Sequence, residues 1–225
     1  MAISVVEVTN FNFWDTIDEW TDSSIVNAEF IDNVSSHEKI YEECEKFDGW
    51  TGAMDFENQS YELRDRFIKI AKETAEPSKD TTAINEKHDR YFTIPGYGNY
   101  GMMKSHDGSI LSDDNPVYWW CVPEEKDFPT LHKFMKENPK YIYPVISKMS
   151  PHVELIPHDH GPEPKYCYNM AVNVSEGSRF AMYPTGNINY KAGDIYKLYV
   201  NNRHSVINGN ETRYHVLFRG GLIYG

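Results

Sequence analysis

The feature of this sequence that most limits its fold is a series of short apolar runs that begins near residue 141 and continues almost to the C-terminus. The runs are YIYPVISKM, HVELI, YCYNMAVNV, SRFAMYP, IYKLYV and RYHVLFRGG, and turn-forming separators such as KAGD and NGNE lie between them. Short strands at nearly regular spacing are typical of all-β sandwiches and barrels. We therefore predict a β-sandwich or jelly roll for the C-terminal half of the chain.

The N-terminal half has a different pattern, in which helices are prominent. Residues 36–47 resemble a capped amphipathic helix, and residues 59–76 place apolar side chains near one face before Pro77. A short third helix is expected at residues 129–137, where Asn-Pro follows directly. We therefore expect helices to pack against the β-rich part.

A stretch without regular periodicity separates these helices from the β-rich part. Residues 78–118 are polar and rich in Gly and Tyr, which is typical either of a lid over a binding site or of plain surface decoration. We predict that residues 1–127 form a helical or mixed decoration that contains this lid. It would pack on a β core of residues 128–225, so that the two parts form one compact unit.

The formal net charge of −12 is unevenly distributed over the 225 residues. Residues 1–127 hold 27 acidic and 11 basic side chains, a net −16, whereas residues 128–225 hold 7 acidic and 11 basic side chains, a net +4. The acid excess argues against a nucleic-acid-binding protein and against a protein of an anionic membrane surface, since both need clustered Lys and Arg. The mildly positive C-terminal part suits an anionic ligand.

The cysteines and the start of the chain bear on its compartment. Cys44, Cys121 and Cys167 are odd in number and widely spaced, as expected for free thiols in a reducing compartment. No apolar run approaches the length of a membrane span, and the first residues lack the pattern of a signal peptide. We therefore predict a soluble, cytoplasmic protein, whose oligomeric state is open.

Five of the nine histidines fall in the last third of the chain. His158 flanks a turn between two predicted strands and His204 lies at the end of a later strand, which is how non-haem Fe(II) oxygenases hold their metal. Arg213, on the following strand, is suitably placed for the far carboxylate of a keto acid, which a guanidinium matches in a bidentate manner. The alternative is that the turn histidines are merely exposed and that Arg213 pairs with a surface acid.

The stretch from about residue 128 to 218 resembles the aspartyl/asparaginyl β-hydroxylase branch of the 2-oxoglutarate- and Fe(II)-dependent oxygenases. The resemblance is carried, in order, by FPTLHKF, VISKMSPHVELIPHDHGP, GDIYKLYVNNRHSVIN and TRYHVLFRG. It implies a double-stranded β-helix, which is a jelly-roll or cupin-like fold, buttressed by the N-terminal helices. It also implies a hydroxylase that uses Fe(II), 2-oxoglutarate and O2 on a peptide, amino-acid or other small-molecule substrate.

The resemblance also assigns roles to individual residues. His158 and His204 resemble the two iron ligands. Arg213 resembles the arginine that pairs with the distal carboxylate of 2-oxoglutarate, and Ser147 resembles a hydroxyl that also contacts this co-substrate. On the next strand the family has an arginine and a histidine; here Asn169 stands in place of the histidine and the arginine contact is missing.

The third metal position is left open by the sequence. The branch has Gly two residues after its first histidine, whereas this chain has His160. This residue could be a third imidazole ligand, a hydrogen-bonding partner of a ligand, or a turn residue facing solvent. Asp159 is at the wrong offset for the carboxylate that most of the superfamily uses. A competing set of His152, Glu154 and His204 has the His-x-acid pattern, but alternation places its first two members within a strand, before the turn.

Two other classes of function remain open. One is a non-catalytic cupin-like protein that binds a metal or a small molecule. Binding of a metal without turnover of 2-oxoglutarate would favour this class. The other is an interaction or structural protein on a jelly-roll scaffold. Two further polar residues have structural interpretations. His215 shares a strand face with Arg213 and could line the pocket, but a core histidine is the preferred interpretation. Asn208 is interpreted as the cap of a turn.

Overall fold

The computed structural model describes residues 13–17, 27–52, 103–105, 117–160 and 166–218. The predicted helix at residues 59–76 lies outside the described residues. The same is true of the predicted lid at 78–118, apart from residues 103–105 and 117–118.

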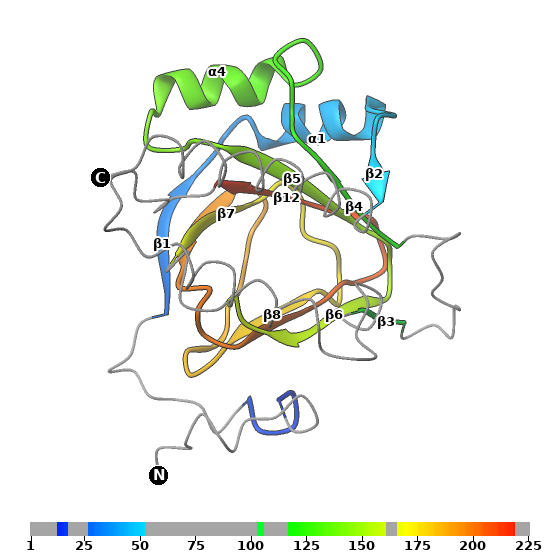
Figure 1. Cartoon of the computed structure of the whole chain (residues 1–225), viewed down its shortest axis with the longest axis vertical. Helices are drawn as coiled ribbons and strands as arrows, with labels where there is room; N and C mark the ends of the chain where they lie inside the picture. The colour runs from blue at the N-terminus through cyan, green and yellow to red at the C-terminus, as the bar shows by residue number, and fades with distance from the viewer. Residues whose placement is uncertain (1–12, 18–26, 53–102, 106–116, 161–165, 219–225) are drawn as a thin grey trace, which may run out of the picture.

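Two antiparallel sheets face each other and form a barrel (Figure 1). The seven-stranded sheet has the order β1 (Ala28–Asn33), β10 (Asp194–Leu198), β7 (Cys167–Ala171), β12 (Arg213–Phe218), β5 (Pro144–Met149), β4 (Tyr118–Cys121) and β2 (Thr51–Gly52). The five-stranded sheet has the order β3 (Met103–Ser105), β6 (Val153–His158), β11 (His204–Ile207), β8 (Arg179–Met182) and β9 (Gly186–Asn187).

The path of the chain through these sheets identifies the fold. From β5 to β12 the chain crosses from one sheet to the other at every connection except that between β8 and β9, which pair with each other. This winding is that of a double-stranded β-helix, so the predicted jelly-roll or cupin-like fold is confirmed. Strands β1, β2 and β4 come before residue 128 and extend the large sheet at both edges. The division of the chain at residues 127 and 128 stays a prediction.

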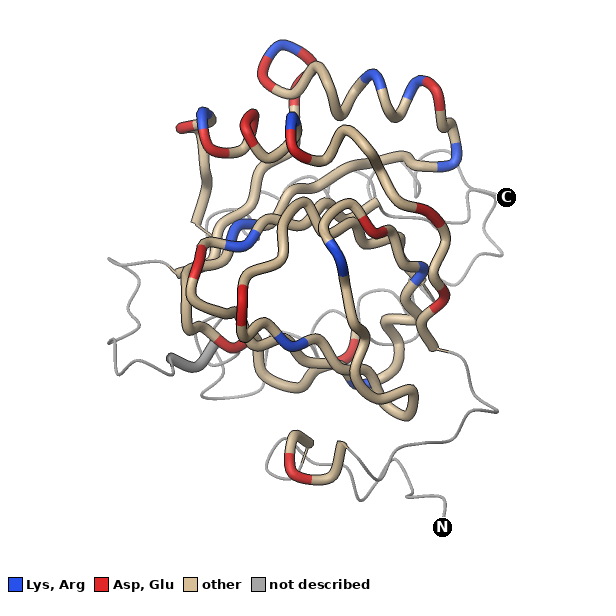
Figure 2. The backbone as a smooth tube through the Cα atoms, turned by 180° about the vertical axis from the view of Figure 1, so that it is seen from behind, with Lys and Arg blue, Asp and Glu red and all other residues tan. Residues whose placement is uncertain are grey.

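Two of the predicted helices are confirmed, and both cover the outer face of the seven-stranded sheet (Figure 1). In α1 (His37–Lys46), the side chains of Ile40 and Cys44 are buried on one face. In α4 (Pro129–Glu137), a proline occupies the first turn, where no backbone N–H is needed, and Leu131 is buried. The remaining faces of the helices carry charges of both signs (Figure 2).

Successive side chains of a strand point to opposite faces of the sheet, so the large sheet contributes to two separate cores. On β12, Val216 and Phe218 pack under the helices, whereas Arg213 and His215 point into the space between the sheets. Polar side chains that are distant in sequence can therefore meet inside the barrel.

The cysteines and the helices bear on the predicted compartment. All three cysteines are free and buried, and burial raises the pKa of the Cys121 thiol to about 12. Within the described residues, no helix is both long enough and apolar enough to cross a membrane. The cytoplasmic location stays a prediction.

The turns at one end of the barrel are tied together by the side chain of Asn208, which is 2% exposed. The two N–H groups of its amide are shared among three backbone carbonyls, those of Met149, Ser150 and Glu211. Its amide oxygen accepts from the hydroxyls of Ser175 and Ser178 and from the backbone N–H of Gly209. One side chain thus joins the β5–β6, β7–β8 and β11–β12 turns, which goes beyond the predicted cap of a single turn.

We expect the Asn208→Ala substitution to lower the free energy of unfolding by about 3 kcal/mol, because it leaves buried polar groups without partners. Denaturant unfolding measures the difference. The matched control is Asn210→Ala in the same turn, where the side chain is exposed. This control should change the free energy by less than about 0.5 kcal/mol. Equal effects of the two substitutions would contradict the role given to Asn208.

Candidate functional site

A β-bulge between β6 and β11 positions His158, the first candidate metal ligand. His204 pairs with His158 and Val206 pairs with Leu155, so three steps along β6 oppose two steps along β11. The extra residue changes the alternation, so that His158 lies on the same inner face as Leu155. Pro157 falls within this irregular step, where a residue that cannot donate to the ladder is tolerated.

Three imidazoles converge at the end of the barrel where β6 ends and β11 begins. The ligand atoms of His158, His160 and His204 all lie within 4.8 Å of one another. The Nε2 atoms of His158 and His160 are 3.3 Å apart, and the ring centroids of His158 and His204 are 4.3 Å apart. The backbone N–H of His160 donates to the carbonyl of Val200 at 2.9 Å. This bond holds the segment after β6 against the connection between β10 and β11. His160 therefore faces the other two rings.

Backbone carbonyls determine which nitrogen is protonated in two of these rings. Nδ1 of His158 donates to the carbonyl of Ile156, and Nδ1 of His204 donates to the carbonyl of Asn202, each at 2.8 Å. Because a carbonyl only accepts, each neutral ring keeps its lone pair on Nε2. Metal-binding histidines are commonly oriented by this kind of hydrogen bond.

Burial lowers the pKa of His158, and it lowers the pKa of His204 further because His158 and His160 add to the effect. Both rings are therefore neutral at pH 7, which is the form that binds a metal.

These shifts make the stability of the metal-free protein depend on pH. Burial also lowers the pKa of His215, with a further contribution from Arg213. When the pH falls below the ordinary histidine pKa of 6.5, the unfolded chain takes up protons that the folded chain does not. We expect the free energy of unfolding to decrease between about pH 6.5 and 5, by up to roughly 1.4 kcal/mol per pH unit for each such histidine. Urea unfolding of EDTA-treated protein across this pH range measures the decrease. A free energy of unfolding that does not change with pH would contradict the prediction.

The competing metal set is not brought together. His152 is exposed in the turn before β6, with a φ of 58°. The carboxylate of Glu154 accepts a hydrogen bond from the indole of Trp14 at 2.8 Å. Neither residue belongs to the histidine group, and neither does Asp159.

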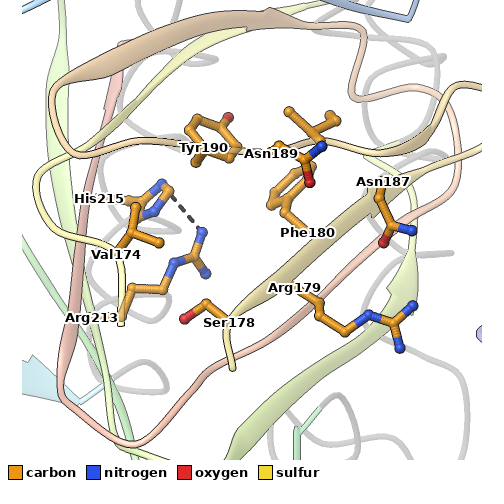
Figure 3. A pocket seen from close by; sticks show the side chains of 10 residues that line it. Val174, Ser178, Arg179, Phe180, Asn187, Asn189, Tyr190, Arg213 and His215 are labelled. Carbon is orange, nitrogen blue, oxygen red and sulfur yellow. Dashed lines mark hydrogen bonds between the residues drawn. The ribbon is translucent and has the colours of Figure 1, made fainter. Parts of the chain in front are cut away.

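A pocket of about 440 Å³ lies between the sheets (Figure 3). Residues of β8, of β9 and of the segment after β9 form its wall, together with Arg213 and His215 of β12. The ring of Phe180 lines this pocket and also stacks on His204, with centroids 6.2 Å apart. Phe180 therefore lies between the pocket and the histidines.

Arg213 is the buried charged group of this pocket, with 8% of its surface exposed. Burial lowers the pKa of Arg213 to about 10, which leaves the guanidinium positively charged at pH 7. None of the ion pairs formed by the described residues involves Arg213, so the alternative of pairing with a surface acid is not seen there. A buried charge without a counter-ion is unfavourable, and an anion bound beside it would remove the penalty.

Arg213 belongs to a polar network inside the barrel. Nη2 of Arg213 lies 3.2 Å from Nδ1 of His215, along the dashed line in Figure 3, and the same ring nitrogen lies 2.5 Å from Oδ1 of Asn169. This oxygen also accepts from the hydroxyl of Tyr190 at 3.1 Å. All partners of Arg213 in this network are uncharged, so the network does not neutralise the guanidinium.

Ser147 lies beside this group on β5. It is buried, it is in register with His215, and its hydroxyl donates to the His215 carbonyl at 3.4 Å. Ser147, Asn169 and Arg213 thus lie on three adjacent strands of the large sheet. His215 is both buried and part of the pocket lining, so the two interpretations of this residue apply together.

Two pocket residues carry no signal in the sequence. Tyr190 lies in the irregular segment between β9 and β10, and Arg179 is an exposed residue at the start of β8. Only the winding of the chain brings these two segments to the wall of one pocket, so no local pattern could have identified them.

No family model and no curated protein matches the sequence. Solved structures with a similar fold include an oxidoreductase of the 2OG-Fe(II) oxygenase family from Burkholderia pseudomallei, which is 14% identical with a TM-score of 0.37. The match covers 47% of this chain and 71% of that one. A Trichoplax adhaerens prolyl hydroxylase, in complex with a hypoxia inducible factor peptide fragment, is 9% identical with a TM-score of 0.47, over 94% and 90% of the two chains. The Lactobacillus farciminis oxalate decarboxylase is 17% identical with a TM-score of 0.33, over 47% of this chain and 30% of its own.

Proposed function

We propose that this protein is an Fe(II)- and 2-oxoglutarate-dependent oxygenase that hydroxylates a C–H bond of a peptide or amino-acid-like substrate. One observation carries the proposal. Three imidazoles converge in the same barrel as a buried guanidinium that has no ion-pair partner among the described residues. The sequence resemblance to the aspartyl/asparaginyl β-hydroxylase branch points to the same residues.

The donor set fits Fe(II). Imidazole is a ligand that iron accepts, and the hydrogen bonds of His158 and His204 leave the lone pair of each ring on Nε2, the atom that would bind the metal. His160 brings a third imidazole to these two, where most of the superfamily uses a carboxylate. Three protein ligands leave further positions open for a keto acid and O2.

The polar residues of the large sheet fit the co-substrate. Arg213 would hold the distal carboxylate of 2-oxoglutarate, with Ser147 and Asn169 on the adjacent strands. Iron and 2-oxoglutarate, when bound, would supply the oxidising chemistry: 2-oxoglutarate would lose CO2 to become succinate, one atom of O2 would enter the succinate, and the other would enter the substrate C–H bond.

The other tasks belong to the chain itself. Phe180 packs against His204 and forms an apolar wall between the histidines and the pocket that Arg213 lines. The fixed tautomers of His158 and His204 remove the need to reorganise these rings when a metal binds.

Anaerobic addition of Fe(II) and 2-oxoglutarate to the metal-free protein, followed by exposure to air, tests the proposal. We expect a visible absorption band once both are bound, and succinate after O2 is admitted. Metal binding without succinate would identify a non-catalytic cupin-like binding protein instead. Binding of neither would favour a structural or interaction role.

The Arg213→Met substitution should raise the concentration of 2-oxoglutarate needed for half-maximal succinate formation by roughly 10- to 100-fold, since it removes charged hydrogen bonds. Fe(II) affinity should not change. Lys148→Met is the matched control, because Lys148 lies over the rings of Trp50 and Trp119 on the outer face of the same sheet. An unchanged requirement for 2-oxoglutarate in Arg213→Met would contradict the assignment.

A further inference from the structure

Tyr190 lies in the irregular segment between β9 and β10, yet its ring is packed among residues of the candidate site. It lines the pocket together with Arg213 and His215 (Figure 3). Its ring centroid lies 5.3 Å from that of His215 and 5.5 Å from that of Phe180, and both contacts are edge-to-face. Aromatic neighbours therefore hold this ring in place on two sides.

The hydroxyl of Tyr190 keeps its proton. Burial raises the pKa of Tyr190 well above its ordinary value of 10, although the charge of Arg213 acts in the opposite direction. The hydroxyl donates a hydrogen bond to Oδ1 of Asn169 at 3.1 Å. A donor is therefore present beside Asn169 throughout the neutral pH range.

This hydrogen bond determines how the amide of Asn169 is oriented. An amide has an acceptor oxygen and a donor nitrogen, so a donor that binds the oxygen sets which way the group faces. Nδ2 of Asn169 forms no hydrogen bond with a described residue, although the side chain is only 6% exposed. A buried N–H group without a partner is unfavourable, so the site suits a ligand that accepts from it.

Asn169 is placed to act together with Arg213. The two residues lie on neighbouring strands, β7 and β12, of the large sheet. Nδ1 of His215 lies between them, 2.5 Å from Oδ1 of Asn169 and 3.2 Å from Nη2 of Arg213. An amide N–H and a guanidinium on neighbouring strands can both donate to one carboxylate.

We propose that Tyr190 is a positioning residue of the co-substrate site: its hydroxyl orients the Asn169 amide so that Nδ2 donates to the carboxylate that Arg213 holds. This inference rests on the proposed function, and it adds a residue that neither the sequence nor the family resemblance identified. Without the hydroxyl the amide is free to turn, and its oxygen would then face the carboxylate and repel it.

A double-mutant cycle on the Fe(II)-loaded full chain tests the inference, with the dissociation constant for 2-oxoglutarate measured anaerobically from the visible absorption band. Tyr190→Phe keeps the ring and removes the hydroxyl, and it should weaken binding about three- to tenfold, as for the loss of one neutral hydrogen bond. Asn169→Ala should weaken binding about tenfold, and adding Tyr190→Phe to it should have no further effect. Fe(II) affinity should be the same in all these variants.

Tyr196→Phe is the matched control. The Tyr196 ring packs against that of Tyr190 with centroids 4.7 Å apart, and its hydroxyl forms no hydrogen bond with a described residue. This variant should bind 2-oxoglutarate like the wild type.

The inference is wrong if Tyr190→Phe binds 2-oxoglutarate like the wild type, or if the effects of Tyr190→Phe and Asn169→Ala add in the double variant. The first comparison uses only the conservative Tyr190→Phe, so it does not depend on the folding of Asn169→Ala. Either result would leave the proposed function standing. Wild-type protein that binds no 2-oxoglutarate would instead overturn the proposed function, and this inference with it.

Discussion

Fe(II) affinity and succinate formation are both expected to fall more than about 100-fold when His204 is replaced by alanine. Loss of a ligand should exceed the effect of losing a residue that merely orients one. His204 is 5% exposed, and two other imidazoles face it from β6 and the following turn. Anaerobic equilibrium dialysis measures the affinity. His152→Ala is the control, since that ring is exposed and lies outside the histidine group, and it should bind Fe(II) like the wild type.

The same measurement decides the role of His160. A loss of affinity in His160→Ala comparable with that in His204→Ala would show that the third imidazole binds the metal. Unchanged affinity would exclude a three-imidazole site. Wild-type affinity in His204→Ala itself would show that the metal centre has been placed wrongly.

The largest effect on stability is expected at Phe218, which is fully buried under α4. Its ring centroid lies 5.0 Å from that of Tyr141 and 6.4 Å from that of Phe134. Phe218→Ala should lower the free energy of unfolding by about 3–5 kcal/mol, because it removes buried apolar surface and leaves a cavity. Phe30→Ala on β1 is the control, since that ring is 54% exposed and its removal should cost less than about 1 kcal/mol. Similar losses at the two positions would contradict this view of the core.

The sequence predicts the strands well, because alternation and turn residues are local signals. The run HVELI corresponds to β6, and RYHVLFRGG corresponds to β12. The helices at residues 36–47 and 129–137 are local features of the same kind, and both are present. The fold class follows from the number and spacing of these elements.

The site depends on features that local patterns do not contain. Regular alternation from Leu155 would place His158 on the outer face, and only the bulge turns it inward. Its position beside a turn and the family resemblance, rather than periodicity, therefore pointed to this histidine. The pairing of Arg179 with β11 and the position of Tyr190 beside His215 arise from the winding of the whole barrel. Such contacts join residues far apart in the chain, and the sequence around each one gives no sign of them.

The amide of Asn208 also has a consequence for the position of Arg213. It accepts from the Ser178 hydroxyl in the turn before β8, and it donates to the Glu211 carbonyl, two residues before Arg213. A single side chain therefore ties the start of β12 to a turn that leads into the facing sheet. With Asn208 replaced by alanine, the start of β12 is no longer held there, and the binding of 2-oxoglutarate at Arg213 should weaken although Asn208 does not line the pocket.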